Sequence, residues 1–161
     1  MGDSVLFVCT ANMCRSPMAE YLLREELPKE SAWTVRSAGT DAADGMPATD
    51  QAVSAMEEIG VDMGRHRSRR LTRETADEAD VIVVMTAAHA ERIEWRFPDV
   101  AHKVCRLKSF VPNAASEDTD IPDPIGLGEY IYRAIRDEMQ VAMPQLCRYL
   151  ESIEKEKRGQ P

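Results

Sequence analysis

Residues 5–20 read VLFVCTANMCRSPMAE, and this stretch decides how the fold begins. The four apolar residues from Val5 to Val8 predict a short buried strand. Ser16 and Pro17 predict the start of a helix, because Ser suits the N-cap and Pro suits the first turn. A strand that passes straight into a helix is typical of folds in which strands and helices alternate.

The same alternation continues along the chain. Further strands are predicted over residues 33–37, 81–85 and 103–107, and helices over 18–27, 48–60, 72–79, 87–95 and 128–155. Pro144 is expected to kink or break the last helix. This order predicts an α/β fold in which helices cover both faces of a parallel sheet. Ligands of such sheets bind beyond the carboxyl ends of the strands, where the loop after the first strand lies.

Length and charge limit the classes of function. The chain has 161 residues, which fits one domain over 1–161 with a frayed tail at 155–161. Its 20 basic and 28 acidic residues give a net charge of −8, so no nucleic-acid partner is expected. The sequence has no apolar run of bilayer length and no room for a signal peptide before the first strand. We therefore expect a cytoplasmic protein with no membrane partner.

The chain has four cysteines, which are Cys9, Cys14, Cys105 and Cys147. They form no CxxC pair and have no histidine at a zinc-ligand spacing, so no metal is expected. Cys105 and Cys147 are expected to pack as small buried hydrophobic residues. Cys9 and Cys14 differ, because both lie in the loop between the first strand and the first helix.

The Cys9–Ser16 loop has the skeleton Cys, five residues, Arg, Ser. Backbone N–H groups in such a loop, together with the N-terminus of the following helix, can hold an oxyanion. The same field favours a thiolate at Cys9, which is a good nucleophile. Arg15 has the planar fork that binds two oxygens of a phosphate group. The alternative is an ordinary turn with a buried cysteine and a surface arginine.

Residues 8–20 resemble the low-molecular-weight protein phosphatase family. The resemblance extends over nearly the whole chain, through residues 36–39, the region of His66, and residues 79–86, 103–108 and 121–124. It implies a four-stranded parallel sheet flanked by helices on both faces, of the low-molecular-weight phosphatase type. It also implies a two-step protein phosphatase that needs no metal and no other cofactor.

The resemblance assigns three residues to catalysis. Cys9 is expected to attack phosphorus, Arg15 to hold the phosphate oxygens, and Asp123 to protonate the leaving group. Read alone, Asp123 is an aspartate that starts a turn between two stiff prolines, Pro122 and Pro124. The loop residues expected to bind phosphate are Thr10, Ala11, Asn12, Met13, Cys14 and Arg15.

Hydrogen-bonding residues around the loop are expected to support it. Ser16 can donate to the Cys9 thiolate, and the resemblance places Asn12, Ser37 and His66 in the support. The alternatives are a strand-end hydroxyl for Ser37 and a surface histidine for His66. His89 is expected on a helix surface and has no assigned role.

Cys14 shares the loop with Cys9. Oxidation of a thiolate beside a second cysteine can form a disulfide, which would switch the protein off reversibly. The alternative is a small residue packed under the loop. Redox regulation through Cys14 is therefore a hypothesis.

Members of the family act on phosphotyrosine or phosphoarginine, or reduce arsenate. No cysteine lies between Cys14 and Cys105, where the arsenate branch needs a redox relay, so arsenate reduction is not favoured. Met13 is bulky and apolar, as in tyrosine-type members, whereas arginine-type members have Thr at this position.

Two other segments favour the arginine branch. Residues 85–89 and 123–130 look more like arginine-type members. Ile125 departs from both branches, because an aromatic residue usually follows this Asp-Pro pair. Met13 and Ile125 are therefore the candidate selectivity residues. We expect phosphotyrosine hydrolysis, with phosphoarginine hydrolysis as the alternative.

Other classes of function are also possible from the loop alone. A phosphocysteine carrier lacks the loop arginine and the remote aspartate, and an inactive phosphate-binding module lacks the acid. Arg15 and Asp123 argue against both. The expected partners are phosphorylated proteins, with inorganic phosphate as product and inhibitor, and the expected state is a monomer.

Overall fold

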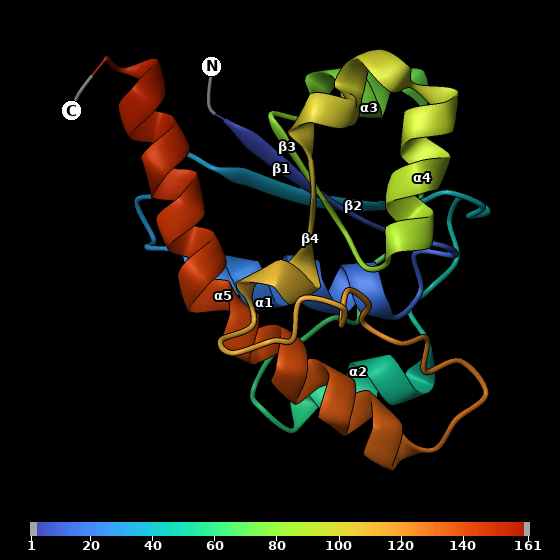
Figure 1. Ribbon diagram of the computed structural model, residues 1–161. Helices are drawn as coiled ribbons and strands as arrows, with labels where there is room; N and C mark the ends of the chain where they lie inside the picture. Colours follow the sequence, from blue (N-terminus) through green and yellow to red (C-terminus); the bar gives the residue numbers. More distant parts are fainter. Residues whose placement is uncertain (1–2, 160–161) are drawn as a thin grey trace.

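The computed structural model describes residues 3–159 (Figure 1). Its elements in chain order are β1 (Ser4–Cys9), α1 (Arg15–Glu26), β2 (Thr34–Gly39), α2 (Asp50–Glu57), α3 (Arg73–Glu78), β3 (Val81–Val84), α4 (Ala87–Arg96), the 3-10 helix η1 (Pro98–Lys103), β4 (Val104–Arg106), the 3-10 helix η2 (Leu107–Phe110) and α5 (Glu129–Lys157). Every helix and strand predicted from the sequence is present. The predicted tail begins inside α5, and Gln160 and Pro161 lie outside the described residues.

The four strands are parallel and lie in the order β2-β1-β3-β4. This confirms the four-stranded parallel sheet. β1 is a central strand, with β2 paired on one side and β3 on the other. The chain therefore reverses its direction of travel across the sheet next to β1, and the loop after β1 starts at this switch point. Switch points of this kind are where α/β sheets bind ligands.

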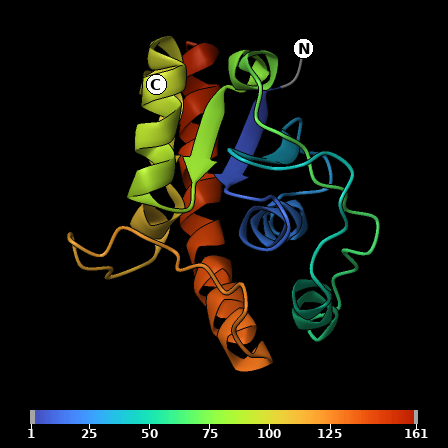
Figure 2. The same cartoon turned by 90° about the vertical axis from the view of Figure 1, so that its right-hand side faces the viewer.

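Alternation along β1 divides the core into two layers. Val5, Phe7 and Cys9 pack with side chains of α1, α2 and α5, whereas Leu6 and Val8 pack with side chains of α3 and α4. Figures 1 and 2 show these helices on opposite sides of the sheet. The Cys9 side chain consequently lies on the α1 side, at the carboxyl end of its strand.

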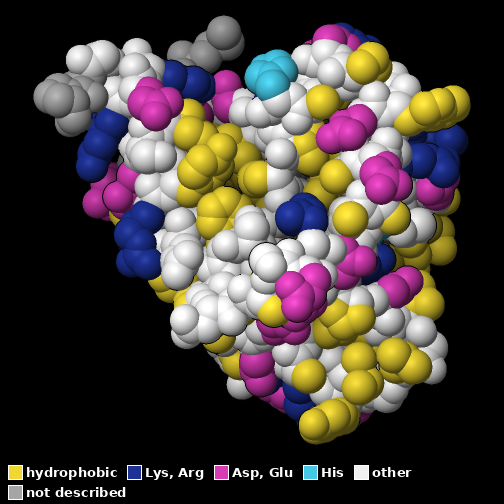
Figure 3. Space-filling view, in the orientation of Figure 1, with side chains coloured by type: hydrophobic (Ala, Val, Ile, Leu, Met, Phe, Trp, Pro, Cys, Tyr) yellow, Lys and Arg dark blue, Asp and Glu magenta, His cyan; other side chains and the backbone are white. Residues whose placement is uncertain are grey.

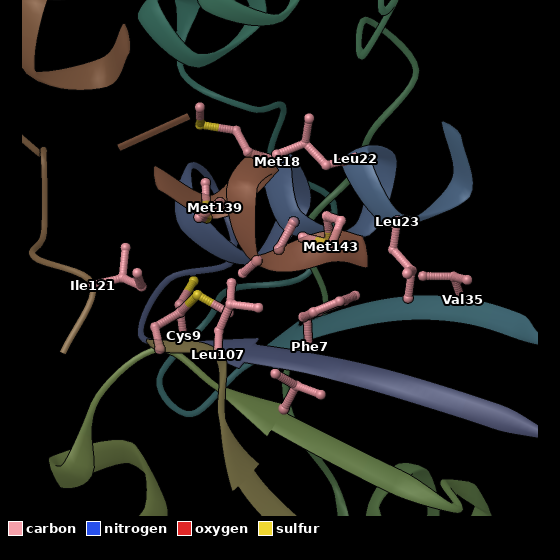
Figure 4. Close-up of a cluster of buried hydrophobic side chains, with 14 of the residues drawn as sticks. Phe7, Cys9, Met18, Leu22, Leu23, Val35, Leu107, Ile121, Met139 and Met143 are labelled. Atoms are coloured by element: carbon pink, nitrogen blue, oxygen red, sulfur yellow. The ribbon is translucent and has the colours of Figure 1, made fainter. Parts of the chain in front are cut away.

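Pro144 does not break α5, although the sequence suggested a kink or a break. An internal proline costs a helix about 3 kcal/mol. Met139, Met143, Leu146 and Leu150 are all buried along one side of α5, and Figure 4 shows the first two among side chains of α1. Burying a side chain of this size contributes about 1.5–3 kcal/mol. The packing of these four residues therefore outweighs the cost of the proline.

The start of α1 differs from the prediction. Cys14 is the N-cap residue and makes no side-chain cap bond, whereas Ser16 lies inside the first turn and is buried. The Ser16 hydroxyl lies 2.9 Å from the Cys9 Sγ and 3.3 Å from the Ala38 carbonyl oxygen. The expected N-cap role of Ser16 is thus wrong, because its hydroxyl is used inside the loop that precedes the helix.

Candidate active site

The carbonyl groups of the Cys9–Ser16 loop point away from its centre. Neighbouring backbone N–H groups donate to the carbonyls of Cys9, Thr10 and Met13, from Thr40, Asp41 and Thr49 respectively, each at 2.9 Å. In a planar trans peptide the N–H points opposite to the carbonyl. The N–H groups that follow these carbonyls therefore face the inside of the loop, which creates a site for an oxyanion.

Two backbone features allow the loop to close this tightly. Asn12 has a φ of 57°, a left-handed conformation that Asn tolerates better than most residues. At Gly39, the end of β2 passes so close that an added Cβ would lie 2.4 Å from the Thr10 carbonyl oxygen and 2.9 Å from the Asn12 nitrogen. Only glycine fits at this position.

The Asn12 side chain is fully buried and lies at the centre of the loop's support. Its Nδ2 donates to the hydroxyls of Ser16 at 2.8 Å and Ser37 at 2.9 Å. Its Oδ1 accepts from the backbone N–H of Arg69 at 3.0 Å. Ser37 in turn donates to the Glu20 carboxylate at 2.6 Å. Ser37 is thus part of the support rather than an isolated strand-end hydroxyl.

His66 also contacts Asn12. Its ring is buried, and Nε2 lies 2.8 Å from the Asn12 carbonyl oxygen. Burial lowers the pKa of His66 below its usual value, so the neutral ring with a proton on Nε2 fits the contact. The alternative of a surface histidine is wrong.

Cys9 lies at the base of the loop with 2% of its surface exposed. Its Sγ is 2.9 Å from the Ser16 hydroxyl. The Ser16 hydroxyl accepts a hydrogen bond from Asn12, and its one proton can point either at this sulfur or at the Ala38 carbonyl oxygen, 3.3 Å away. This geometry suits a thiolate, which accepts such a bond.

Arg15 spans the space between the loop and the segment around Asp123. Its Nη1 donates to the Ile121 carbonyl at 3.0 Å, and its Nη2 lies 3.8 Å from an Asp123 carboxylate oxygen. Its Nε is buried and has no hydrogen-bond partner among residues 3–159. A buried guanidinium N–H without a partner is costly, so the arrangement suits a ligand with an oxygen acceptor. The reading of Arg15 as a surface arginine is wrong.

The Asp123 side chain is 48% exposed and reaches the loop from the other side. One carboxylate oxygen accepts from the Ile125 N–H at 3.0 Å, which fixes a local turn. The preceding segment is tied to β3 and α4, since Ile121 N–H donates to the Met85 carbonyl at 2.8 Å and Ala87 N–H donates to Asp120 at 2.8 Å. The structure thus brings Asp123 and Arg15 together.

Cys14 is buried under the loop. Burial, followed by the proximity of Cys9, raises the pKa of the Cys14 thiol to about 12. Cys105 and Cys147 pack against the core as expected but are only partly buried, and burial raises their pKa values to about 12 and 11. These three side chains are protonated thiols at neutral pH and are weak nucleophiles.

His89 is a residue that the sequence analysis missed. It is 6% exposed, so its expected position on a helix surface is wrong. Its Nε2 lies 2.8 Å from the Thr10 hydroxyl and its Nδ1 lies 2.9 Å from the Thr86 hydroxyl. Burial, aided by the nearby Arg15 charge, lowers the pKa of His89 to about 4. A neutral ring therefore holds the residue that follows Cys9.

Apolar side chains of the loop and of residues 125–130 are exposed. Met13 is partly exposed, and Ile125, Leu127 and Tyr130 are 51%, 50% and 76% exposed. Figure 3 shows hydrophobic side chains gathered at the lower end of one face, over the first turns of α5.

The described part of the chain has no group of three or more His, Cys, Asp or Glu side chains suited to holding a metal ion. Over residues 3–159, none of the helices combines the length and the apolar character that a bilayer crossing requires.

Comparison with known proteins gives one consistent family. Residues 4–159 match the model of the low molecular weight phosphotyrosine protein phosphatase family. A probable low molecular weight protein-tyrosine-phosphatase, EpsP of Ralstonia solanacearum, is 41% identical over 124 residues, which is 77% of this chain and 79% of EpsP.

Two solved structures have the same fold. The YwlE arginine phosphatase from Geobacillus stearothermophilus has a TM-score of 0.84 and 39% identity, with 96% of each chain covered. The tyrosine phosphatase Wzb from Escherichia coli K30, solved in complex with sulphate, has a TM-score of 0.82 and 29% identity, with 93% of this chain and 99% of Wzb covered.

Proposed function

Because the chain belongs to the low molecular weight phosphotyrosine protein phosphatase family, we propose that it hydrolyses phosphate monoesters on proteins through a phosphocysteine. The observation that carries the proposal is the buried Arg15 Nε, which has no partner among residues 3–159 and stands beside the inward N–H groups of the loop. A phosphoryl group between Cys9 and Arg15 would satisfy both.

The first step transfers the phosphoryl group to sulfur. The Cys9 thiolate attacks phosphorus, the S–P bond forms, and the bond to the leaving oxygen breaks. Asp123 gives its proton to that oxygen, so the leaving group does not depart as an anion. The loop N–H groups and Arg15 hold the three remaining oxygens, whose charge they compensate.

The second step releases phosphate. A water molecule attacks phosphorus and gives a proton to Asp123, and the S–P bond breaks. Inorganic phosphate leaves, and the Cys9 thiolate and the protonated Asp123 are restored. The exposed side chain of Asp123 suits this double use, because it meets first the leaving group and then water.

Supporting residues keep the loop ready for both steps. Ser16 donates to the Cys9 sulfur, and Asn12 with Ser37 and His66 fixes the backbone that presents the N–H groups. His89, which lies on α4, positions Thr10 through its contact with the Thr10 hydroxyl. Ser16 contacts the reacting sulfur itself, whereas the other residues act through the loop.

The proposed substrate group is phosphotyrosine. Met13 provides a flexible apolar wall at the loop, and the exposed Ile125 and Leu127 extend it on the other side. An aryl ring gains from such walls, whereas a guanidinium group requires polar or acidic partners.

Phosphoarginine is the second candidate. In sequence, similarity to the protein-arginine-phosphatase of Geobacillus stearothermophilus covers 94% of this chain, whereas similarity to the probable tyrosine phosphatase EpsP covers 77%. Ile125 also leaves the site without an aromatic ring after the Asp-Pro pair, which weakens the clamp for an aryl group.

Four further properties are proposed, which are inhibition by phosphate, location, oligomeric state and oxidation. Inorganic phosphate is the product, and it should inhibit by occupying the loop. We propose that the protein acts as a cytoplasmic monomer, and that oxidation can join Cys14 to Cys9. The low acidity of the Cys14 thiol makes Cys9 the sulfur that is oxidised first.

Turnover of matched phosphotyrosine and phosphoarginine peptides tests the substrate. We expect a preference for phosphotyrosine, and a shift of about tenfold or more toward phosphoarginine in Met13→Thr, because the polar hydroxyl replaces the apolar wall. Val141→Thr, on the exposed side of α5, is the matched control and should change neither rate. A wild-type preference for phosphoarginine would select the second candidate instead.

A further inference from the structure

A small polar hollow lies beside the loop's support, outside the proposed catalytic site. Its volume is about 170 Å³, and it is bordered by α1, β2 and the segment of residues 65–69. The side chains that determine its charge are Glu20, Arg24, Arg36, Arg65, Arg67 and Arg69. Five arginines therefore surround one carboxylate in a protein whose net charge is −8.

Alternation along the 65–69 segment gathers the arginines on one side. His66 and Ser68 are buried, while Arg65, Arg67 and Arg69 are exposed. The segment is held in an extended form beside the end of β2, where Gly39 N–H donates to the Arg69 carbonyl at 2.9 Å. Side chains of an extended chain alternate between two sides, so the three guanidinium groups share the side away from the core.

The nearby carboxylates of residues 3–159 form no ion pair with these three guanidinium groups. Glu20 is already bound by Arg24 at 2.7 Å and by Ser37 at 2.6 Å. Arg67 donates to the backbone carbonyls of Gly64 and His66. Within residues 3–159, no carboxylate lies in ion-pair contact with Arg65, Arg67 or Arg69. Like charges held this close repel one another, and a bound anion would relieve that repulsion.

We propose that this hollow is a second oxyanion site, which binds one tetrahedral dianion such as phosphate between Arg65, Arg67 and Arg69. The volume suits the ion, because a single ordered water needs only about 10–15 Å³ of cavity. Guanidinium forks match the paired oxygens of a phosphoryl group. Arg36, whose nearest carboxylate is that of Glu78 at 3.8 Å, can add a fourth contact.

The hollow is adjacent to the support of the Cys9–Ser16 loop. Ser37 and His66 line it, and both bond to Asn12 on their other side. An anion that contacts Ser37 or His66 in the hollow would thus be linked to Asn12 through that single residue. Binding at the two sites should therefore be coupled, and the coupling must be equal in both directions.

Two sources can supply the same chemistry. One is free inorganic phosphate, and the other is a second phosphoryl group on a protein substrate. Both present a tetrahedral dianion to the arginines. The site does not depend on the proposed catalytic function, because binding can be measured with an ion that is never turned over.

Sulfate titration followed by proton–nitrogen NMR tests the site. In the wild-type chain we expect two separate saturation curves, one for the loop N–H groups and one for the guanidinium N–H groups of Arg65, Arg67 and Arg69. Chloride at matched ionic strength should give neither curve. If the guanidinium signals move no further in sulfate than in chloride, the proposal is wrong.

Variants test which arginines give rise to the second saturation curve. Arg65→Gln with Arg67→Gln should abolish it and leave a loop curve whose midpoint changes only by the lost coupling. Arg148→Gln with Lys155→Gln, which removes the same charge from α5, should leave both curves unchanged. Should the first double variant not fold, Arg36→Gln is expected to weaken the second curve about threefold or more. Retention of both curves in every variant would overturn the assignment.

A last pair of titrations separates the sources, using Cys9→Ser so that no peptide is hydrolysed. If the substrate supplies the anion, a doubly phosphorylated peptide should bind about tenfold tighter than a singly phosphorylated one, and Arg65→Gln with Arg67→Gln should remove the gain. If free phosphate is the ligand, only the inorganic ion should shift the guanidinium signals. Failure of both anions to shift them contradicts the proposal.

Discussion

The Cys9–Ser16 loop and the segment around Asp123 are built in opposite ways. In the loop, Asn12 is fully buried, and its side chain is fixed by hydrogen bonds that it donates to α1 and β2 and accepts from the 65–69 segment. Asp123 is half exposed and is positioned by a local turn and one distant contact with Arg15. An oxyanion site gains from a rigid set of donors, whereas an acid that must meet both a leaving group and water needs access.

Arg15→Lys should have the largest effect, because it damages the rigid region. Lysine keeps the charge but loses the fork that spans the loop and the Ile121 carbonyl. We expect kcat for an aryl phosphate to fall about 10³-fold. Arg133→Lys, at an exposed pair with Glu58, is the matched control and should stay near wild type. A loss below tenfold for Arg15→Lys would mean that the fork is not used.

Asp123→Asn should have a smaller effect that depends on the substrate. We expect kcat/KM, which reports the first step, to fall about 10²–10³-fold for phosphotyrosine and much less for a nitrophenyl phosphate, because a good leaving group needs little protonation. Steady-state kinetics on both substrates measures this, with Asp137→Asn as the control on α5. Equal losses on the two substrates would show that Asp123 does not act as the acid.

His89→Gln should have its smallest effect at neutral pH and its clearest effect in acid. The folded-state pKa of His89 is about 4, below that of a free histidine near 6.5, so the unfolded chain binds more protons between these values. Stability of the wild type should therefore fall as pH drops from about 6.5 toward 4, by at most about 3 kcal/mol. The pKa of buried His66 is also lowered, so this residue adds to the loss of stability as the pH falls.

Denaturant unfolding at pH 7 and pH 5 checks this expectation. His89→Gln should lose part of the acid sensitivity, whereas His102→Gln, an exposed histidine, should keep all of it. An unchanged difference between the two pH values in His89→Gln would show that this ring does not stay neutral inside the protein.

The sequence was most informative where chemistry is local. The strand, the loop skeleton and the helix lie within residues 5–26, so Cys9, Arg15 and their neighbours could be predicted together. Asp123 was found through the family resemblance, because nothing in its own neighbours separates an acid from a turn residue. The order of strands and helices followed from hydrophobic spacing together with local start and stop signals such as Pro17.

The features that could not be predicted from the sequence depend on contacts between residues that are far apart in the chain. His89 lies 79 residues from Thr10 along the chain, and the Arg69 N–H lies 57 residues from the Asn12 side chain. Position 39 requires glycine because the Cys9–Ser16 loop passes close to it, and the sequence around Gly39 does not indicate this contact. Ser16 was misassigned as a cap because its residue type suits that role, although the sulfur of Cys9 takes its hydroxyl instead.

Trapping the covalent intermediate tests the central claim most directly. Asp123→Asn should slow the second step as well as the first, so a rapid acid quench during turnover of an aryl phosphate should capture phosphoenzyme. Mass spectrometry of the digested protein is expected to find one phosphoryl group on the peptide that carries Cys9, and none in Cys9→Ser with Asp123→Asn. Steady turnover with no phosphoryl group on Cys9 at any time, or with the group on another residue, would contradict the account.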